Sequence, residues 1–224
     1  LTYVMCAIFG SFDKSMLEVL YEANKQRGNF ASSVVCLSDD DQYIAKHEGD
    51  INFDKFNYAG KKNIEYLLGH VQAPTSAKRT WNYNTSHPFE SMTWLVSHNG
   101  VLTNEKKLRR KHTRFLENPV DTAVIVELLE KFTQVNKNQV NTIKQVLSAL
   151  EGSYALSMVN CETNDVYIAR VGSILHYNTK GSYSTMPGAG YKVLEEGVLM
   201  KLNKKTKRWN KVGTFETKSP FTFV

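Results

Sequence analysis

The stretch Met5-Cys6-Ala7-Ile8-Phe9-Gly10 places a cysteine inside an apolar run that is typical of a buried strand. A methionine before a small residue has the form of a start signal, and cleavage after Met5 would give Cys6 a free α-amino group. Such an amine titrates at roughly pH 7.7–8.0, so it can serve as general base for the thiol beside it. Cys6 is therefore a candidate N-terminal nucleophile. Taken alone, the run is more typical of core packing, where free cysteine is common.

The composition predicts one domain with an extensive core. The chain has 224 residues, 42% hydrophobic and 22% charged, and we expect a single domain over 1–224. Cys6, Cys36 and Cys161 form an odd set without CxxC or histidine-rich spacing, which argues against disulfides and zinc, so no metal and no cofactor is expected. No apolar run reaches the roughly 18–20 residues of a membrane span, and the start lacks a signal-peptide pattern. We expect a cytoplasmic protein that contacts no membrane.

The net charge is +6, and basic residues concentrate in two segments, Lys106–Lys111 and Lys201–Lys211. Such clusters can meet nucleic acid or an acidic partner. More often a run of charges is a solvated face. Contact with nucleic acid through these clusters is therefore one alternative, beside contact with an acidic partner and a solvated surface.

The spacing of apolar residues predicts strands, then helices, then strands again. Helices are expected over 13–26, 104–111, 120–132 and 138–150, and strands over 5–10, 31–37, 42–47, 67–72, 92–97, 154–159, 165–170, 174–177, 183–186, 198–203 and 208–212. The acids at 39–41 indicate a hairpin turn, and 75–91 has no clear period. The pair Asn99-Gly100 is itself a turn signal, and a hairpin is the expectation there. The order predicts an α+β domain in which helices cover sheet faces.

Short motifs recur along the chain in a specific order. They are Met5–Gly10, Arg27-Gly28, Leu68-Gly69-His70, His98-Asn99-Gly100, Asp121-Thr122, Leu150–Leu156 and Ala169-Arg170. Together they resemble the class II glutamine amidotransferase domain of the N-terminal nucleophile superfamily. That domain is the glutaminase half of glutamine phosphoribosylpyrophosphate amidotransferase, glucosamine-6-phosphate synthase and asparagine synthetase. The resemblance implies a four-layer αββα sandwich of two stacked, mostly antiparallel sheets.

The resemblance also implies roles for the motif residues. Amide hydrolysis passes through a tetrahedral oxyanion, and the Asn99 side chain and the Gly100 backbone N–H would be two donors to it. Asp121 would hold the ammonium group of the substrate, although a helix N-cap explains the same aspartate without a ligand. His98 and Arg27 are expected at the substrate site.

Two features depart from the family pattern. The family has arginine two residues after the histidine of its Gly-His motif, where this chain has Gln72. A neutral amide cannot supply the bidentate, charged contact of a guanidinium to the substrate carboxylate. Either Thr75, Ser76 and Arg79 help to hold glutamine, or the substrate differs. Residues 1–5 also precede Cys6, so its amine is blocked until they are removed.

The first functional hypothesis is a glutamine amidohydrolase in which the Cys6 thiolate attacks the side-chain amide and releases ammonia. The expected partners are glutamine and a separate acceptor-domain or synthetase chain. Gln72 and the blocked Cys6 also permit a catalytically silent binding or regulatory subunit. A third alternative is an amidotransferase in modified-nucleobase synthesis, which rests on charge and analogy.

Overall fold

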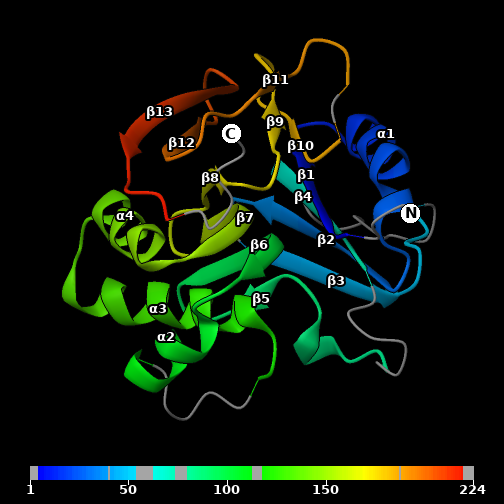
Figure 1. The fold of residues 1–224 in the computed structure, drawn as a ribbon. Coiled ribbons are helices and arrows are strands. Elements are labelled where there is room, and N and C mark those ends of the chain that lie inside the picture. The colour runs from blue at the N-terminus through cyan, green and yellow to red at the C-terminus, as the bar shows by residue number, and fades with distance from the viewer. Residues whose placement is uncertain are drawn as a thin grey trace, which may run out of the picture.

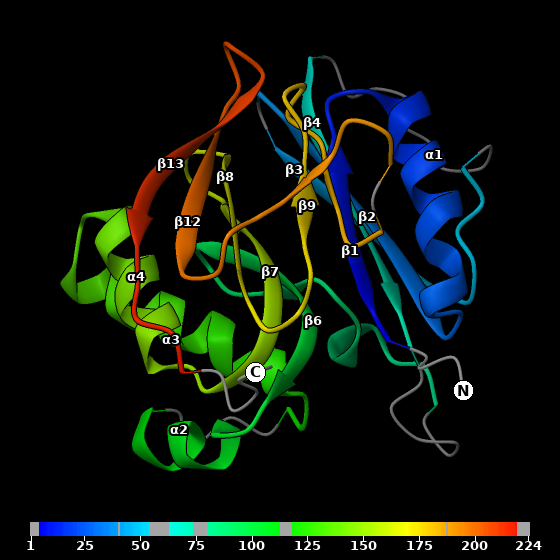
Figure 2. The same cartoon turned by 45° about the horizontal axis from the view of Figure 1, so that its top comes forward.

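Two antiparallel sheets lie face to face, and helices cover the outer face of each (Figure 1). The computed structural model describes residues 5–39, 41–53, 63–73, 80–112, 118–186 and 188–218. Turning the molecule separates the layers into helix, sheet, sheet and helices (Figure 2). The predicted α+β sandwich of four layers is confirmed. None of the helices in the described ranges is long and apolar enough to cross a membrane.

The first sheet contains the strand that follows Cys6. Its order is β11 (Lys192–Val193), β9 (His176–Tyr177), β10 (Tyr183–Ser184), β1 (Ala7–Ser11), β4 (Ile64–Gln72), β2 (Ala31–Ser38) and β3 (Gln42–Glu48). Helix α1 (Lys14–Asn24) covers its outer face and is continued by the 3-10 turn η1 (Lys25–Arg27). The Asp13 carboxylate caps α1 by accepting from Met16 N at 2.9 Å. Leu17 and Leu20 bury the inner side of the helix against Phe9.

The second sheet carries the remaining helices. Its order is β13 (Arg208–Thr214), β12 (Val198–Asn203), β8 (Asp165–Val171), β7 (Gly152–Asn160), β6 (Trp94–Leu102) and β5 (Phe89–Glu90). Helices α2 (Glu105–His112), α3 (Asp121–Val135) and α4 (Gln139–Ala149) cover its outer face (Figure 1), and the 3-10 turn η2 (Tyr83–Thr85) precedes β5. The largest side chain in this outer core is Trp94, which is fully buried with Leu128 and Ile143.

Side chains alternate between the two faces of each strand, so the core divides into layers. On β1, Phe9 packs under α1 whereas Ile8 points between the sheets. On β6, Trp94 packs under the helices of the second sheet whereas Leu95 points between the sheets. The inner layer between the sheets is therefore built from Ile8 and Leu95 together with other buried residues, among them Val35, Leu37, Tyr66, Leu68, Ala155, Val159, Ile168 and Tyr183.

Most predicted elements are confirmed within a few residues. The four helices are present, and the hairpin at 39–41 joins β2 to β3 with Leu37 opposite Gln42, although Asp40 lies outside the described residues. The strands expected over 174–177 and 183–186 are shorter, at two residues each in β9 and β10. The two-residue strands β5 and β11 carry too little periodicity to be predicted.

The turn predicted at Asn99-Gly100 is wrong. Strand β6 continues through this pair to Leu102, and Asn99 and Gly100 lie opposite Ala155 and Tyr154 of β7. Gly100 has φ +149°, and a Cβ added there would lie 2.0 Å from Ser153 O. The glycine therefore permits a close strand contact in an unusual backbone conformation rather than a reversal of the chain.

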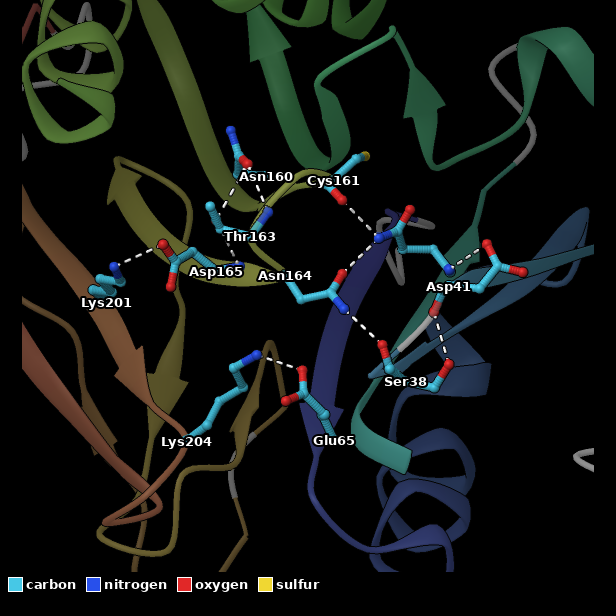
Figure 3. A network of polar contacts seen from close by, with 11 residues as sticks. Ser38, Asp41, Glu65, Asn160, Cys161, Thr163, Asn164, Asp165, Lys201 and Lys204 are labelled. Carbon is cyan, nitrogen blue, oxygen red and sulfur yellow. Dashed lines mark hydrogen bonds and ion pairs between the residues drawn. The ribbon is translucent and has the colours of Figure 1, made fainter. Parts of the chain in front are cut away.

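The two sheets are fastened by a network of hydrogen bonds, here called the polar clasp (Figure 3). It lies at the end of the sandwich away from Cys6, because Ser38 pairs with Ile64 at one end of β4 whereas Ala7 pairs with Val71 at the other. Gln42 Nε2 donates to Cys161 O at 2.8 Å and to Asn164 Oδ1 at 2.6 Å, and Asn164 Nδ2 donates to Ser38 O at 2.7 Å. These bonds join the β2–β3 hairpin to the β7–β8 turn. An ion pair between Lys204 and Glu65 adds a second link between the sheets.

We predict that Asn164→Ala lowers the free energy of unfolding by about 2 kcal/mol, because it leaves buried partners unsatisfied. Asn164 also has φ +54°, so Asn164→Gly tests whether backbone conformation alone matters. Urea unfolding of both variants measures the loss, with exposed Asn141→Ala as control. Full stability of Asn164→Gly would show that the side-chain bonds contribute little.

Candidate active site

Several predicted site residues face the layer between the sheets. On β4, Tyr66 and Leu68 point into this layer, and the same alternation directs His70 and Gln72 there. On β6, Leu95 points into it, and the alternation directs Asn99 there as well. Ala7 pairs with Val71, so Cys6 lies at the end of β1 beside Gln72 at the end of β4. The fold therefore brings Cys6, Gln72 and Asn99 to one end of the inner layer.

The edge of β6 beyond Val96 has no neighbouring strand among the described residues. Strand β5 pairs only with Leu95 and Val96. In an antiparallel pair, alternate residues turn both backbone groups away from the partner strand. Leu102 N donates to Asp121 Oδ2 at 3.0 Å rather than to β7, so the backbone groups of Leu102 face away from β7. By alternation, the backbone N–H and C=O groups of Gly100 and His98 face the same open edge.

Gly100 N–H lies between two filled positions on this edge. His98 O is 3.2 Å from His70 Nε2, and Leu102 N is held by Asp121. Strand alternation turns Gly100 N–H away from β7, and among the described residues no turn, loop or side-chain group accepts from it. A preorganised donor that lacks a partner is what an oxyanion site requires.

A cavity of about 670 Å³ opens beside this edge. Gly100 and Asp121 line it, and Glu105 adds a second carboxylate to its wall. The other lining residues are Thr80, Asn82, Thr85, Val101, Leu102, Pro119 and Val120. Of the predicted site residues, Gly100 and Asp121 thus line the cavity. The others do not line it: Cys6, Gln72, His98, Asn99 and Arg27.

Asp121 is the first residue of α3 but not its cap. Val120 holds the N-cap position and has no capping side chain, so the capping alternative for Asp121 is wrong. Burial raises the pKa of Asp121, but His98 and the N–H donors of Leu102 and Thr122 outweigh this and lower it to about 2. Asp121 is therefore a carboxylate that bridges β6 to α3 and also faces the cavity.

Arg27 lies on η1 next to the candidate nucleophile. Its Nε donates to Cys6 O at 3.2 Å, and its Nη1 lies 3.7 Å from Met186 Sδ. Burial lowers the pKa of Arg27, and the nearby Cys6 thiol acts in the opposite direction. The next residue, Gly28, packs so closely that an added Cβ would lie 2.4 Å from Gln72 C. The Arg27-Gly28 pair thus connects the ends of β1 and β4.

Gln72 occupies the position of the family arginine and is 2% exposed. Its Nε2 lies 3.5 Å from Thr85 O, a long contact to the wall of the cavity. Thr75, Ser76 and Arg79 lie outside the described residues. The role of Gln72 toward the substrate stays a prediction.

Sequence reasoning missed a cluster of buried histidines around Thr122. His98 Nδ1 lies 3.1 Å and His87 Nε2 lies 2.9 Å from Thr122 Oγ1. The rings of His70 and His87 are stacked with centroids 4.1 Å apart. The signal available in the sequence was the presence of polar rings in apolar surroundings, as in Leu68-Gly69-His70-Val71.

Comparison with known proteins finds a match to one family over part of the chain. Residues 83–180 match the family described as glutamine amidotransferase domain. Glutamine–fructose-6-phosphate aminotransferase (isomerizing) of Staphylococcus aureus is 29% identical over 180 residues, covering 74% of this chain and 29% of that protein. The same enzyme of Halalkalibacterium halodurans is 25% identical over 175 residues, with the same coverage. The chain thus spans 29% of the length of these relatives.

A solved structure shares the fold. Glutamine phosphoribosylpyrophosphate amidotransferase from B. subtilis, complexed with ADP and GMP, superposes with a TM-score of 0.75 at 19% identity, over 94% of this chain and 49% of that one. The family match and the shared fold are thus both similarities to glutamine amidotransferases. The sequence is similar to glutamine–fructose-6-phosphate aminotransferases, and the fold is similar to that of the phosphoribosylpyrophosphate amidotransferase.

We predict that Asp121→Asn destabilises the protein by about 2 kcal/mol at neutral pH, because the charge is lost while an oxygen acceptor for Leu102 N remains. The pKa of Asp121 in the fold, about 2, lies below its ordinary 3.8, so its stabilisation is present above pH 3.8 and is lost as the pH falls toward 2. Urea unfolding of parent and variant across this range measures the difference. A difference that is constant with pH would contradict the prediction.

Proposed function

We propose that this domain hydrolyses the side-chain amide of glutamine and supplies the ammonia to an acceptor site. The observation that carries the proposal is the Gly100 N–H, which points from the open edge of β6 beside a cavity that Asp121 also lines. The relatives that the chain resembles carry glutamine in their names, which supports the same substrate.

The chemistry assigns one role to each group. Cys6 Sγ attacks the amide carbon, and its proton passes to the free α-amine of the same residue. The carbonyl oxygen becomes an oxyanion, to which the Asn99 side chain and Gly100 N–H donate. Collapse breaks the C–N bond, and the leaving nitrogen takes the proton as ammonia. Water then cleaves the thioester, which gives glutamate and restores the thiol.

The remaining residues hold the two ends of the substrate. The Asp121 carboxylate, which stays ionised at neutral pH, attracts the ammonium group of glutamine. The Gln72 side chain is assigned to the α-carboxylate of glutamine. Thr75 and Arg79 are further candidates for the carboxylate. Arg27 fixes the carbonyl of Cys6 and so orients the nucleophile. His98 contributes through its contacts with Thr122 and Asp121 rather than from the cavity wall.

Exposure of the amine requires removal of the residues before Cys6. Met5 is 46% exposed, which fits a cleavable bond at this position. The acceptor chemistry would be supplied by a partner chain or an adjoining acceptor domain, since the chain corresponds to 29% of the length of its relatives. The assay of protein beginning at Cys6 distinguishes a catalytically silent subunit from this proposal. Contact with nucleic acid gains no support, because Lys201 and Lys204 of one basic segment pair with Asp165 and Glu65.

We predict that protein beginning at Cys6 releases ammonia from glutamine and that Cys6→Ala abolishes the release. Cys161→Ala is the matched control, because burial raises the pKa of the Cys161 thiol to about 12 and keeps it protonated. Ammonia is assayed with and without a candidate partner. Lack of turnover by the trimmed protein in every setting would favour the silent subunit.

We predict that Gln72→Arg tightens glutamine binding about ten- to a hundredfold, because a charged fork contributes roughly 1.5–3 kcal/mol to carboxylate binding. Gln72→Lys restores the charge without the fork and should gain less. Calorimetry in a Cys6→Ala background measures affinity without turnover. An unchanged affinity in Gln72→Arg would place the carboxylate away from residue 72.

A further inference from the structure

We propose that His70 is a positioning residue for the oxyanion segment, His98–Gly100, and acts through the carbonyl of His98. This inference rests on the proposed function, because it assigns the oxyanion to that segment. The contact is His70 Nε2 to His98 O at 3.2 Å, between strands of opposite sheets. That carbonyl belongs to the peptide that leads into Asn99. Its orientation therefore sets the direction of both proposed donors.

The ring of His70 can only donate in this contact. A backbone carbonyl accepts, so Nε2 must carry the proton. His70 is 1% exposed, and burial lowers its pKa to about 3, so the ring is neutral at neutral pH. We assign the Nε2–H tautomer on this basis. A neutral donor fixes the peptide without burying an unpaired charge between the sheets.

The side chain of His98 is held by residues at the start of α3. His98 Nδ1 lies 3.1 Å from Thr122 Oγ1 and 3.6 Å from Asp121 Oδ1, whereas its Nε2 is buried without a partner among the described residues. A buried N–H without an acceptor costs about 1–3 kcal/mol, so we assign the proton to Nδ1. The Thr122 hydroxyl then accepts from His98 Nδ1, and His87 Nε2 lies 2.9 Å from the same oxygen, whose own proton is directed to Asp121 Oδ1 at 3.5 Å.

These contacts close a circuit. His87 contacts the Thr122 hydroxyl through Nε2 and stacks on His70 with an interplanar angle of 23°, and His70 holds the carbonyl of His98. The His98 residue is thus fixed at its ring and at its carbonyl by two different layers of the fold. Strand pairing fixes only the alternate residues of β6 to β7, so the open edge needs this second support.

Paired substitutions at His70 test the proposal. The amide nitrogen of glutamine reaches about as far as Nε2, whereas asparagine falls short, so only His70→Gln can keep the bond. We expect His70→Asn to lower kcat per folded molecule by about ten- to a hundredfold with little change in KM, as misplacement by about 1 Å does. His70→Gln should recover most of this loss. His176→Gln is the control, because it removes a similar contact, Nδ1 to Thr185 O at 3.2 Å, on β9.

A second measurement does not depend on turnover. The ¹⁵N shifts of the imidazole in Cys6→Ala protein report the tautomer, and we expect His70 to be neutral with its proton on Nε2. A proton on Nδ1 would overturn the proposal, as would equal kcat values for the parent, His70→Asn and His70→Gln. An inactive parent would refute the proposed function instead, and the tautomer would still decide whether His70 donates to the oxyanion segment.

Discussion

The open edge of β6 is the constraint on which the candidate site depends. Strand β5 is two residues long and pairs only with Leu95 and Val96, so the backbone groups farther along the edge need other partners. Buried backbone groups without partners cost free energy. His70 satisfies the carbonyl of His98 and Asp121 satisfies the N–H of Leu102. Between them lies the N–H of Gly100, for which the described residues offer no acceptor on this edge, and the short β5 is the reason that it is available.

The sequence predicts the layers well because apolar spacing reports burial directly. Helix 120–132 and strand 31–37 show this, since their apolar residues fill the cores that the structure contains. The pair Asn99-Gly100 shows where local signals fail. The same residues that favour a turn also allow a strand to approach Ser153 closely, and only the partner strand β7 decides between the two.

The site was predictable to the extent that it consists of contiguous motifs. His98-Asn99-Gly100 and Asp121-Thr122 are each adjacent in sequence, so a resemblance finds them together. The histidine cluster is different, because His70 and His87 come from separate segments and meet only when the two sheets stack. The periodicity of α3 predicts only that Thr122 is a helix residue and gives no sign of its contacts with His87 and His98. Contacts between residues of different layers produce no regular spacing in the sequence, so sequence patterns cannot predict them.

The polar clasp of Gln42 and Asn164 has a consequence for how such a domain diverges. It joins the sheets at the end opposite to Cys6 and uses none of the residues proposed for chemistry. The residues that join the sheets are thus separate from those proposed for the chemistry, and the same fold occurs in a solved amidotransferase structure at only 19% identity, with a TM-score of 0.75. A descendant that lost its nucleophile would keep its sheets clasped, and selection could recruit the surviving shape for binding alone.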